Sequence, residues 1–181
     1  PVMSWIHGGA YLTGSAHGAL YQMETLASRG VVLVTINYRL GPLGFLKLDE
    51  ITNGKIPSTG NEGLLDQRLA IKWVKKNIEA FGGNPENITI FGESAGSWSC
   101  ALQVGMGIKG DFQKVICQSG GGDAARSIET ANQWGELFIA KCHDKNIRLD
   151  DLINATPEQL IEVAKLMKHQ ELSDGSTWVM P

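Results

Sequence analysis

The sequence predicts an α/β fold in which a mostly parallel sheet carries helices on both faces. Three observations support this prediction. Short runs of β-branched and aromatic residues alternate with segments whose apolar residues recur every three or four positions. The run at residues 31–37 is apolar almost throughout, as in a parallel strand covered on both faces. Ser94, finally, stands between glycines at the junction of a predicted strand and a predicted helix, and parallel sheets bind ligands at such strand ends.

The first half of the chain predicts two strands and two helices. Residues 2–6 form the first strand and residues 31–37 the second, with a helix between them at residues 20–27. A polar excursion rich in turn residues then leads to Asn61, which can cap a long helix. The apolar residues of this helix that we expect to face the core are Leu65, Leu69, Ala70, Trp73, Val74, Ile78 and Phe81.

The second half of the chain repeats the alternation. Residues 87–91 predict a buried strand, and residues 95–104 are small and apolar enough for a packed helix. Residues 114–118 predict another buried strand, and residues 125–142 another helix. Thr156-Pro157-Glu158-Gln159 then begins a last helix, because it offers a cap, a proline in the first turn and a glutamine at the third position.

Composition restricts the classes of function. The chain of 181 residues is 43% hydrophobic and 19% charged, which suits one globular domain. A net charge of −3 gives no basic surface for nucleic acid, and no apolar run is long enough to span a bilayer. The three cysteines have no metal-like spacing, and we expect Cys100 and Cys117 to be reduced core residues. The abrupt opening and close of the chain suggest a fragment of a longer protein.

Ser94 is the candidate nucleophile. Gly92-Glu93-Ser94-Ala95-Gly96 fits the pattern G-x-S-x-G, and its strand-turn-helix context predicts a nucleophile elbow. Gly92 and Gly96 are then required, because a side chain at either position would collide where strand and helix pass each other. The alternative is a glycine-rich loop with an incidental serine, which the flanking residues disfavour.

A second glycine motif follows the first predicted strand. Gly8 and Gly9 allow the chain to turn so that backbone N–H groups can hold the negative oxygen of a tetrahedral intermediate. We expect His7 to hold this loop by hydrogen bonds rather than to catalyse. Because the loop and Ser94 must face each other, the first and third strands must be neighbours, so we predict the strand order second, first, third, fourth.

Longer segments around these motifs carry a family resemblance. They read WIHGG (5–9), VTINYRLG (34–41), GFL (44–46), GNEGLLDQ (60–67), FGGNPENITIFGESAG (81–96) and QSG (118–120). In combination they resemble the type-B carboxylesterase/lipase family of α/β-hydrolases, which includes the cholinesterases and bacterial nitrobenzyl-esterase-like enzymes. The resemblance implies a partial α/β-hydrolase catalytic domain over residues 1–181, without its N-terminal strands and without the C-terminal part that carries the acid and the histidine.

The resemblance also implies the reaction and its central residues. It implies a serine carboxylesterase that acts on a small-molecule ester, with Ser94 as nucleophile and no cofactor or metal. The N–H groups of Gly8, Gly9 and Ala95 would form the oxyanion hole. Ala10 stands where many relatives have a third glycine, and an alanine N–H can still donate.

Further residues are implied around this centre. Glu93 and Ser119 resemble the polar residues that the family places beside its catalytic triad, and the alternative is that they are solvated or capping groups. Tyr11, Leu12 and Trp98 are expected to form part of a substrate pocket. The oligomeric state and the acyl and alcohol specificity stay open. Two Asn-X-Thr sequons, at residues 87 and 154, do not establish secretion, and a cytoplasmic location is favoured.

The catalytic base is not among the expected residues. Only His143 and His169 follow Ser94, and both lie in polar sequence that predicts surface positions. We therefore expect the triad acid and histidine to lie beyond these 181 residues. Two other functions stay open: a hormone-sensitive-lipase-like esterase, which the 61–67 and 81–85 segments disfavour, and a non-catalytic neuroligin-like binding domain, which the presence of Ser94 disfavours.

Overall fold

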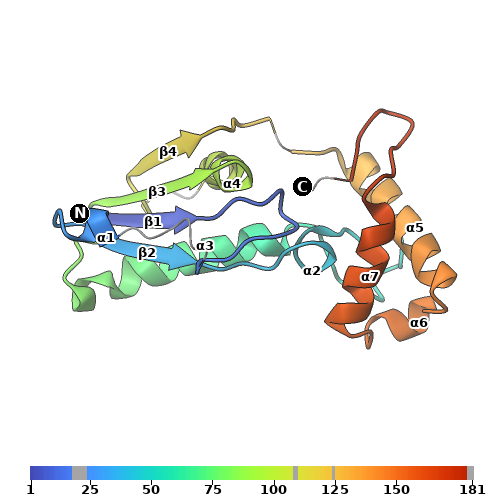
Figure 1. The fold of residues 1–181 in the computed structure, drawn as a ribbon. Coiled ribbons are helices and arrows are strands. Elements are labelled where there is room, and N and C mark those ends of the chain that lie inside the picture. The colour runs from blue at the N-terminus through green and yellow to red at the C-terminus, as the bar shows by residue number, and fades with distance from the viewer. Residues whose placement is uncertain (18–23, 108–109, 124, 179–181) are drawn as a thin grey trace. The chain divides into compact units, whose positions relative to one another are not determined.

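The computed structural model describes residues 1–17, 24–107, 110–123 and 125–178 (Figure 1). The chain divides into two compact units, each described here by itself. The sheet unit comprises Pro1–Tyr38 and Leu64–Ala125, and the helical unit comprises Arg39–Gly63 and Arg126–Pro181.

The sheet unit is built on four parallel strands. They are β1 (Val2–Ile6), β2 (Val32–Ile36), β3 (Ile88–Glu93) and β4 (Lys114–Gln118). Their order in the sheet is β2-β1-β3-β4, and every neighbouring pair is parallel (Figure 1). The predicted strand order is therefore confirmed, and so is the α/β class.

The register of β1 and β3 brings two chain segments to the same edge of the sheet. Ile6, the last residue of β1, pairs with Gly92 near the end of β3. Because the strands are parallel, the glycine motif after β1 and Ser94 after β3 both leave the sheet at its carboxyl edge. The fold thus places the two sequence motifs at neighbouring strand ends.

Helices of the sheet unit pack along these strands. They are α1 (Glu24–Ala27), α3 (Glu62–Asn77), the 3₁₀ turn η2 (Ile78–Phe81) and α4 (Ala95–Gly105). Val74 and Ile78 pack against Val2 of β1 and Ile88 of β3, where the core of this unit lies. The residues predicted for the first helix that precede α1 lie outside the described residues.

The predicted buried face of α3 is wrong in part. Leu65, Leu69, Trp73 and Phe81 are 45–69% exposed. The buried positions are Leu64, Gln67, Ile71, Val74 and Ile78, which also recur at three- and four-residue spacing. Apolar residues cover more than one side of this helix, so the spacing alone does not select the side that packs.

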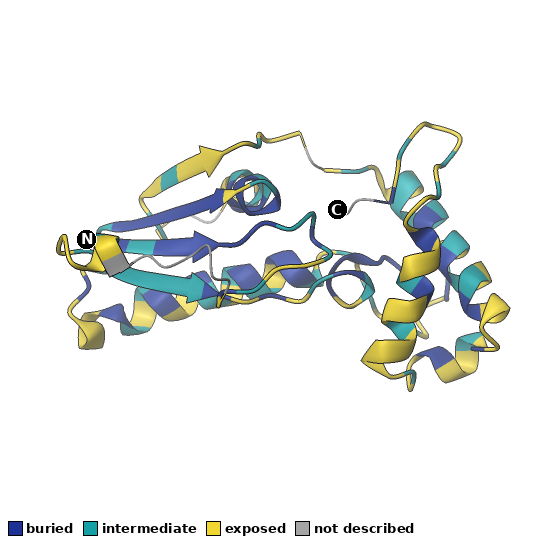
Figure 2. Cartoon of the chain, in the orientation of Figure 1, coloured by how far each residue is buried: buried dark blue, intermediate teal, exposed yellow. Residues whose placement is uncertain are grey.

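The two outer strands are less buried than predicted. β1 and β3 are buried almost throughout, whereas β2 is half-buried up to Ile36 and β4 is largely exposed (Figure 2). Each outer strand has one neighbouring strand among the described residues, which explains the difference. Cys117 of β4 is consequently exposed, which corrects its assignment to the core, while Cys100 is buried as expected.

The helical unit consists of α2 (Pro42–Phe45), α5 (Ile128–Asp144), α6 (Leu149–Leu152) and α7 (Pro157–Met167). Helix α5 packs against α6 and α7, and α2 packs against α7. The predicted start of the last helix is confirmed: Thr156 and Gln159 form a capping box, in which each side chain accepts from the other's backbone N–H. None of the described helices is long and apolar enough to cross a membrane.

Candidate active site

Ser94 forms a one-residue turn between β3 and α4. Its backbone has φ 55° and ψ −123°, a conformation that few residues other than glycine adopt. Its N–H donates to the Gln118 carbonyl at 2.9 Å, and its carbonyl accepts from the N–H groups of Ser97 and Trp98 at 2.9 and 3.0 Å. The predicted succession of strand, sharp turn and helix is therefore present, with hydrogen bonds on both sides of Ser94.

The glycines that flank Ser94 are needed for close packing. A Cβ atom at Gly92 would lie 2.5 Å from the carbonyl oxygen of Gly96, and one at Gly96 would overlap the Ile6 carbonyl. Neither obstacle is a flexible side chain, because both are backbone atoms. These contacts join β1, β3 and the start of α4 at the point where Ser94 turns.

The loop after β1 passes directly beside this turn. A Cβ atom at Gly8 would lie 3.2 Å from Cβ of Ser94 and 3.3 Å from Oε2 of Glu93. The structure thus brings Gly8 next to Glu93 and Ser94, although more than eighty positions separate Gly8 from these two residues in the sequence. A side chain at Gly8 would collide with the backbone of this turn, because its Cβ would also lie 2.6 Å from the Glu93 carbonyl oxygen.

We call residues 8–13 the glycine loop. Gly9 has φ 113° and Ala10 has φ 53°, and the Gly9 carbonyl accepts from the N–H groups of Leu12 and Thr13, both at 3.0 Å. Among the described residues, no backbone hydrogen bond is donated by the N–H groups of Gly8, Gly9 and Ala10 in this loop, or by that of Ala95 directly after Ser94. Unpaired donors of this kind suit the binding of an oxyanion.

Comparison with known proteins assigns the chain to a family. The model of the carboxylesterase family matches residues 1–175. The chain belongs to the carboxylesterase family. It is 43% identical to the para-nitrobenzyl esterase of Bacillus subtilis over 175 residues, covering 94% of this chain and 35% of that protein. It is 53% identical to the bile salt-activated lipase of Bos taurus over 149 residues, covering 78% of this chain and 24% of that protein.

Solved structures of carboxylesterases support the same family assignment. A PNB esterase superposes with a TM-score of 0.86 at 40% identity, covering 100% of this chain and 38% of that one. The Geobacillus stearothermophilus carboxylesterase EST55 superposes with a TM-score of 0.85 at 40% identity, covering 98% of this chain and 38% of that one. The recognised family and the α/β-hydrolase fold are therefore confirmed. The chain spans about a third of the length of the para-nitrobenzyl esterase that it matches.

His7 of this carboxylesterase-family chain is buried beneath the glycine loop. Its ring stacks on Tyr38 with centroids 4.4 Å apart, and the Tyr38 hydroxyl donates to the His7 carbonyl at 2.7 Å. Nδ1 lies 2.8 Å from the Gly8 carbonyl, so the hydrogen is on Nδ1 in the neutral ring. Burial lowers the pKa of His7, which outweighs the opposite effect of this hydrogen bond. These contacts suit the loop-holding role that the sequence predicts.

Glu93 and Ser119 flank the Ser94 turn. The Glu93 side chain is exposed and lies beside Gly8. Ser119 is exposed, has φ 57° and directly follows Gln118, whose carbonyl holds the Ser94 N–H. Both residues are therefore next to the turn, as expected for polar groups beside a catalytic serine, and their roles remain predictions.

Tyr11 lies in the interior of the sheet unit and not in the predicted substrate pocket. Its side chain is fully buried and its hydroxyl accepts from Ser99 at 3.2 Å, so it does not line an open pocket. Leu12 and Trp98 are half-buried. Sequence reasoning missed the role of Ser99 altogether, because it lies 88 positions from Tyr11 and belongs to no motif.

A catalytic base for Ser94 is not visible in the described part of the chain. No described side chain forms a hydrogen bond with the Ser94 hydroxyl, and His7 is directed to the Gly8 carbonyl. His143 and His169 are exposed residues of the helical unit, in agreement with the prediction of surface positions.

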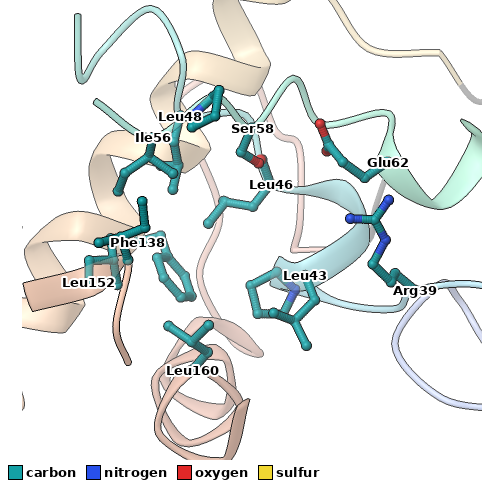
Figure 3. Close-up of a pocket in the computed structure, with 13 residues that line it drawn as sticks. Arg39, Leu43, Leu46, Leu48, Ile56, Ser58, Glu62, Phe138, Leu152 and Leu160 are labelled. Carbon is teal, nitrogen blue, oxygen red and sulfur yellow. The ribbon is translucent and has the colours of Figure 1, made fainter. Parts of the chain in front are cut away.

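The helical unit contains a separate, largely apolar cavity of about 280 Å³ (Figure 3). The polar side chains that line it are Arg39, Ser58 and Glu62. The Glu62 carboxylate accepts hydrogen bonds from the N–H and hydroxyl of Thr59, and the Ser58 hydroxyl donates to the Leu46 carbonyl. These groups stabilise the surrounding loop, and no nucleophile with a neighbouring base lines the cavity. The cavity therefore offers no alternative to Ser94 as the candidate nucleophile.

Proposed function

We propose that the full-length protein is a serine carboxylic ester hydrolase. The Ser94 hydroxyl oxygen attacks the carbonyl carbon of a small-molecule ester, and the alcohol leaves with a proton. Water then attacks the acyl-enzyme and releases the carboxylic acid and the free serine. The observation that carries this proposal is the strained Ser94 turn with the glycine loop packed against it, where a Cβ at Gly8 would lie 3.2 Å from Cβ of Ser94.

Backbone N–H groups form the oxyanion hole in this proposal. Gly8, Gly9 and Ala95 are the predicted donors, and Ala10 is a fourth candidate because its N–H is also unpaired among the described residues. The donors lie on two elements, the loop after β1 and the first turn of α4. Donors that are fixed before reaction stabilise the developing charge without reorganisation, and removal of one costs about 10²–10³ in kcat.

The base and its orienting acid complete the site from outside these 181 residues. This part of the proposal is supported by the exposed positions of His143 and His169 and by the length of the relatives, of which the chain spans about a third. Residues 1–181 are then part of one catalytic domain. A histidine base would take the proton from Ser94 and return it to the leaving alcohol.

The alternatives receive less support. A hormone-sensitive-lipase-like esterase is disfavoured because the carboxylesterase family model extends over residues 1–175, including the 61–67 and 81–85 segments. A neuroligin-like binding domain would not need Ser94 in a strained turn beside unpaired N–H groups. Both arguments favour ester hydrolysis.

Replacement of the nucleophile tests the proposal. In the full-length protein, Ser94→Ala should lower turnover of a p-nitrophenyl ester by about 10⁴-fold or more. A fluorophosphonate should label the wild-type protein on Ser94, identified by peptide mass spectrometry. Ser28→Ala, which removes an exposed hydroxyl bonded to the Thr25 carbonyl, is the matched control and should retain activity. Wild-type turnover by Ser94→Ala, or absence of labelling, would refute the proposal.

A further inference from the structure

Four polar side chains form a line of hydrogen bonds through the interior of the sheet unit. Gln103 Nε2 donates to Gln67 Oε1 at 3.4 Å, and Gln67 Nε2 donates to Ser99 Oγ at 3.0 Å. Ser99 Oγ then donates to Tyr11 Oη at 3.2 Å. All four side chains are fully buried. Burying a polar side chain costs free energy that its hydrogen bonds only offset. Stability alone therefore does not require polar side chains at these four positions.

The line connects the glycine loop to two helices. Tyr11 belongs to the loop, Ser99 and Gln103 belong to α4, and Gln67 belongs to α3. At the far end, Gln103 Nε2 also donates to the Leu64 carbonyl at 2.8 Å, which fixes the line to the backbone of α3. Because α4 begins directly after Ser94, the line ties the loop to the helix that positions this serine.

The glycine loop needs such an attachment. Ala10 and Tyr11 have φ 53° and 58°, a region that residues other than glycine populate sparsely and at a cost in free energy. Strain of this kind persists only where the surroundings hold the backbone. The Tyr11 side chain supplies an inward anchor, and its ring lies nearly parallel to that of Trp98, at 20° with centroids 6.4 Å apart.

We propose that Tyr11, Ser99 and Gln67 are positioning residues that hold the glycine loop, and with it the candidate N–H donors of Gly8, Gly9 and Ala10, where the oxygen of the tetrahedral intermediate develops. The inference rests on the proposed function and adds residues that touch neither the ester nor Ser94. Loss of the Tyr11–Ser99 bond should loosen the loop without changing the surface that binds the ester. The variant should therefore bind the ground state as before and stabilise the transition state less.

Tyr11 acts in this arrangement as a hydrogen-bond partner and not as a base. Burial raises the pKa of the Tyr11 phenol, although the bond from Ser99 works in the opposite direction. The phenol therefore stays protonated across the pH range in which an esterase is assayed. The pH dependence of kcat should accordingly be the same in the wild type and in a Tyr11→Phe variant.

The test uses the full-length protein with Tyr11→Phe, Ser99→Ala and the double variant. Each single change should lower kcat by about tenfold, less than the 10²–10³ that follows complete loss of a donor, with KM unchanged. The affinity for a trifluoromethyl ketone, which forms a tetrahedral adduct with the serine, should fall by the same factor. The double variant should lose no more than Ser99→Ala alone, because the bond that Tyr11→Phe removes is already absent from that variant.

Controls separate positioning from stability and from the proposed function. Thr52→Val removes a buried hydroxyl of the helical unit that donates to the Leu48 carbonyl at 2.7 Å, so it should lower the melting temperature and leave kcat unchanged. If Tyr11→Phe does not fold, Ser99→Ala deletes a single oxygen atom, keeps the tyrosine ring and provides the same comparison. Unchanged kcat, or a fall in kcat without the parallel loss of ketone affinity, would overturn the inference. The proposed function would survive that result as long as Ser94→Ala is inactive.

Discussion

The sheet unit and the helical unit differ in where they carry backbone strain. Six described residues other than glycine have positive φ. The two in the helical unit are Asn53 and Asn146, and asparagine tolerates this conformation better than most residues. The four in the sheet unit are Ala10, Tyr11, Ser94 and Ser119, none of which is favoured there. Strain is thus concentrated around the Ser94 turn, where the surrounding contacts must hold it.

Buried polar groups show the same contrast. In the helical unit, Thr52 bonds to a carbonyl four positions away and Lys47 pairs with Asp49 at 2.5 Å and with Glu50 at 3.2 Å. In the sheet unit, the bonds from Gln67 to Ser99 and from Ser99 to Tyr11 span 32 and 88 positions. Local bonds shape one loop, whereas these long-range bonds join separate elements. The unit that carries the candidate site is therefore the one whose polar interior fixes its elements relative to one another.

The largest expected effect comes from the packing at Ser94. In the full-length protein, Gly96→Ala should lower the free energy of unfolding by about 3 kcal/mol or more, because the new methyl group would overlap the Ile6 carbonyl. Urea unfolding measures this change, and ester turnover should fall with it. Gly105→Ala on the same helix is the matched control, since a Cβ there meets nothing within 4 Å, and it should change stability by no more than about 0.5 kcal/mol. Equal effects at both positions would contradict the close approach of β1 and α4.

The pH dependence of stability tests the buried state of His7. Its pKa is lowered in the folded protein, so the unfolded chain binds a proton more readily. The contribution of His7 to stability is thus complete above its ordinary pKa, near 6.5, and falls as the pH drops below that value. The loss cannot exceed about 1.4 kcal/mol per pH unit, the limit for one proton.

The measurement compares melting temperatures of full-length wild type and His7→Asn between pH 8 and pH 5. Asparagine can still donate to the Gly8 carbonyl but does not titrate in this range. The difference between the two proteins should shrink as the pH falls, because only the wild type loses stability through His7. A difference that stays constant with pH would show that the imidazole is not held neutral.

The strand order could be predicted from the sequence because the proposed reaction requires two sequence motifs to lie side by side. The requirement that the glycine loop face Ser94 gave the strand order β2-β1-β3-β4, which the structure confirms. Burial was harder to predict, as β4 and the wrongly assigned side of α3 show. A sequence records that a residue is apolar, but what covers it depends on neighbours elsewhere in the chain. Gln67 illustrates the converse, since a polar residue lies on the buried side of α3 when Ser99 accepts its hydrogen bond.

The residues of the candidate site also fall into two groups, those that the sequence predicts and those that only the structure shows. Ser94 and Gly8 could be proposed as site residues from the sequence, because each belongs to a short motif whose glycines have a local steric reason. Tyr11 was misplaced in a pocket, because its partner Ser99 is distant in sequence and carries no motif. Residues that form the site through local geometry can thus be read from the sequence, whereas those that hold it through long-range hydrogen bonds need the structure.

The smallest expected effect tests the concentration of strain directly. In the full-length protein, Ser94→Gly should be more stable than Ser94→Ala by about 1 kcal/mol, since relief of 1–3 kcal/mol of strain is partly offset by the greater freedom of glycine in the unfolded chain. Both variants lack the hydroxyl, so the comparison isolates the backbone. Asn146→Gly should change stability by less than about 0.5 kcal/mol, because asparagine already tolerates φ 60° there. If glycine stabilises position 146 as much as position 94, in urea unfolding, then positive φ at Ser94 is an ordinary turn conformation, and the contrast between the two units does not mark the site.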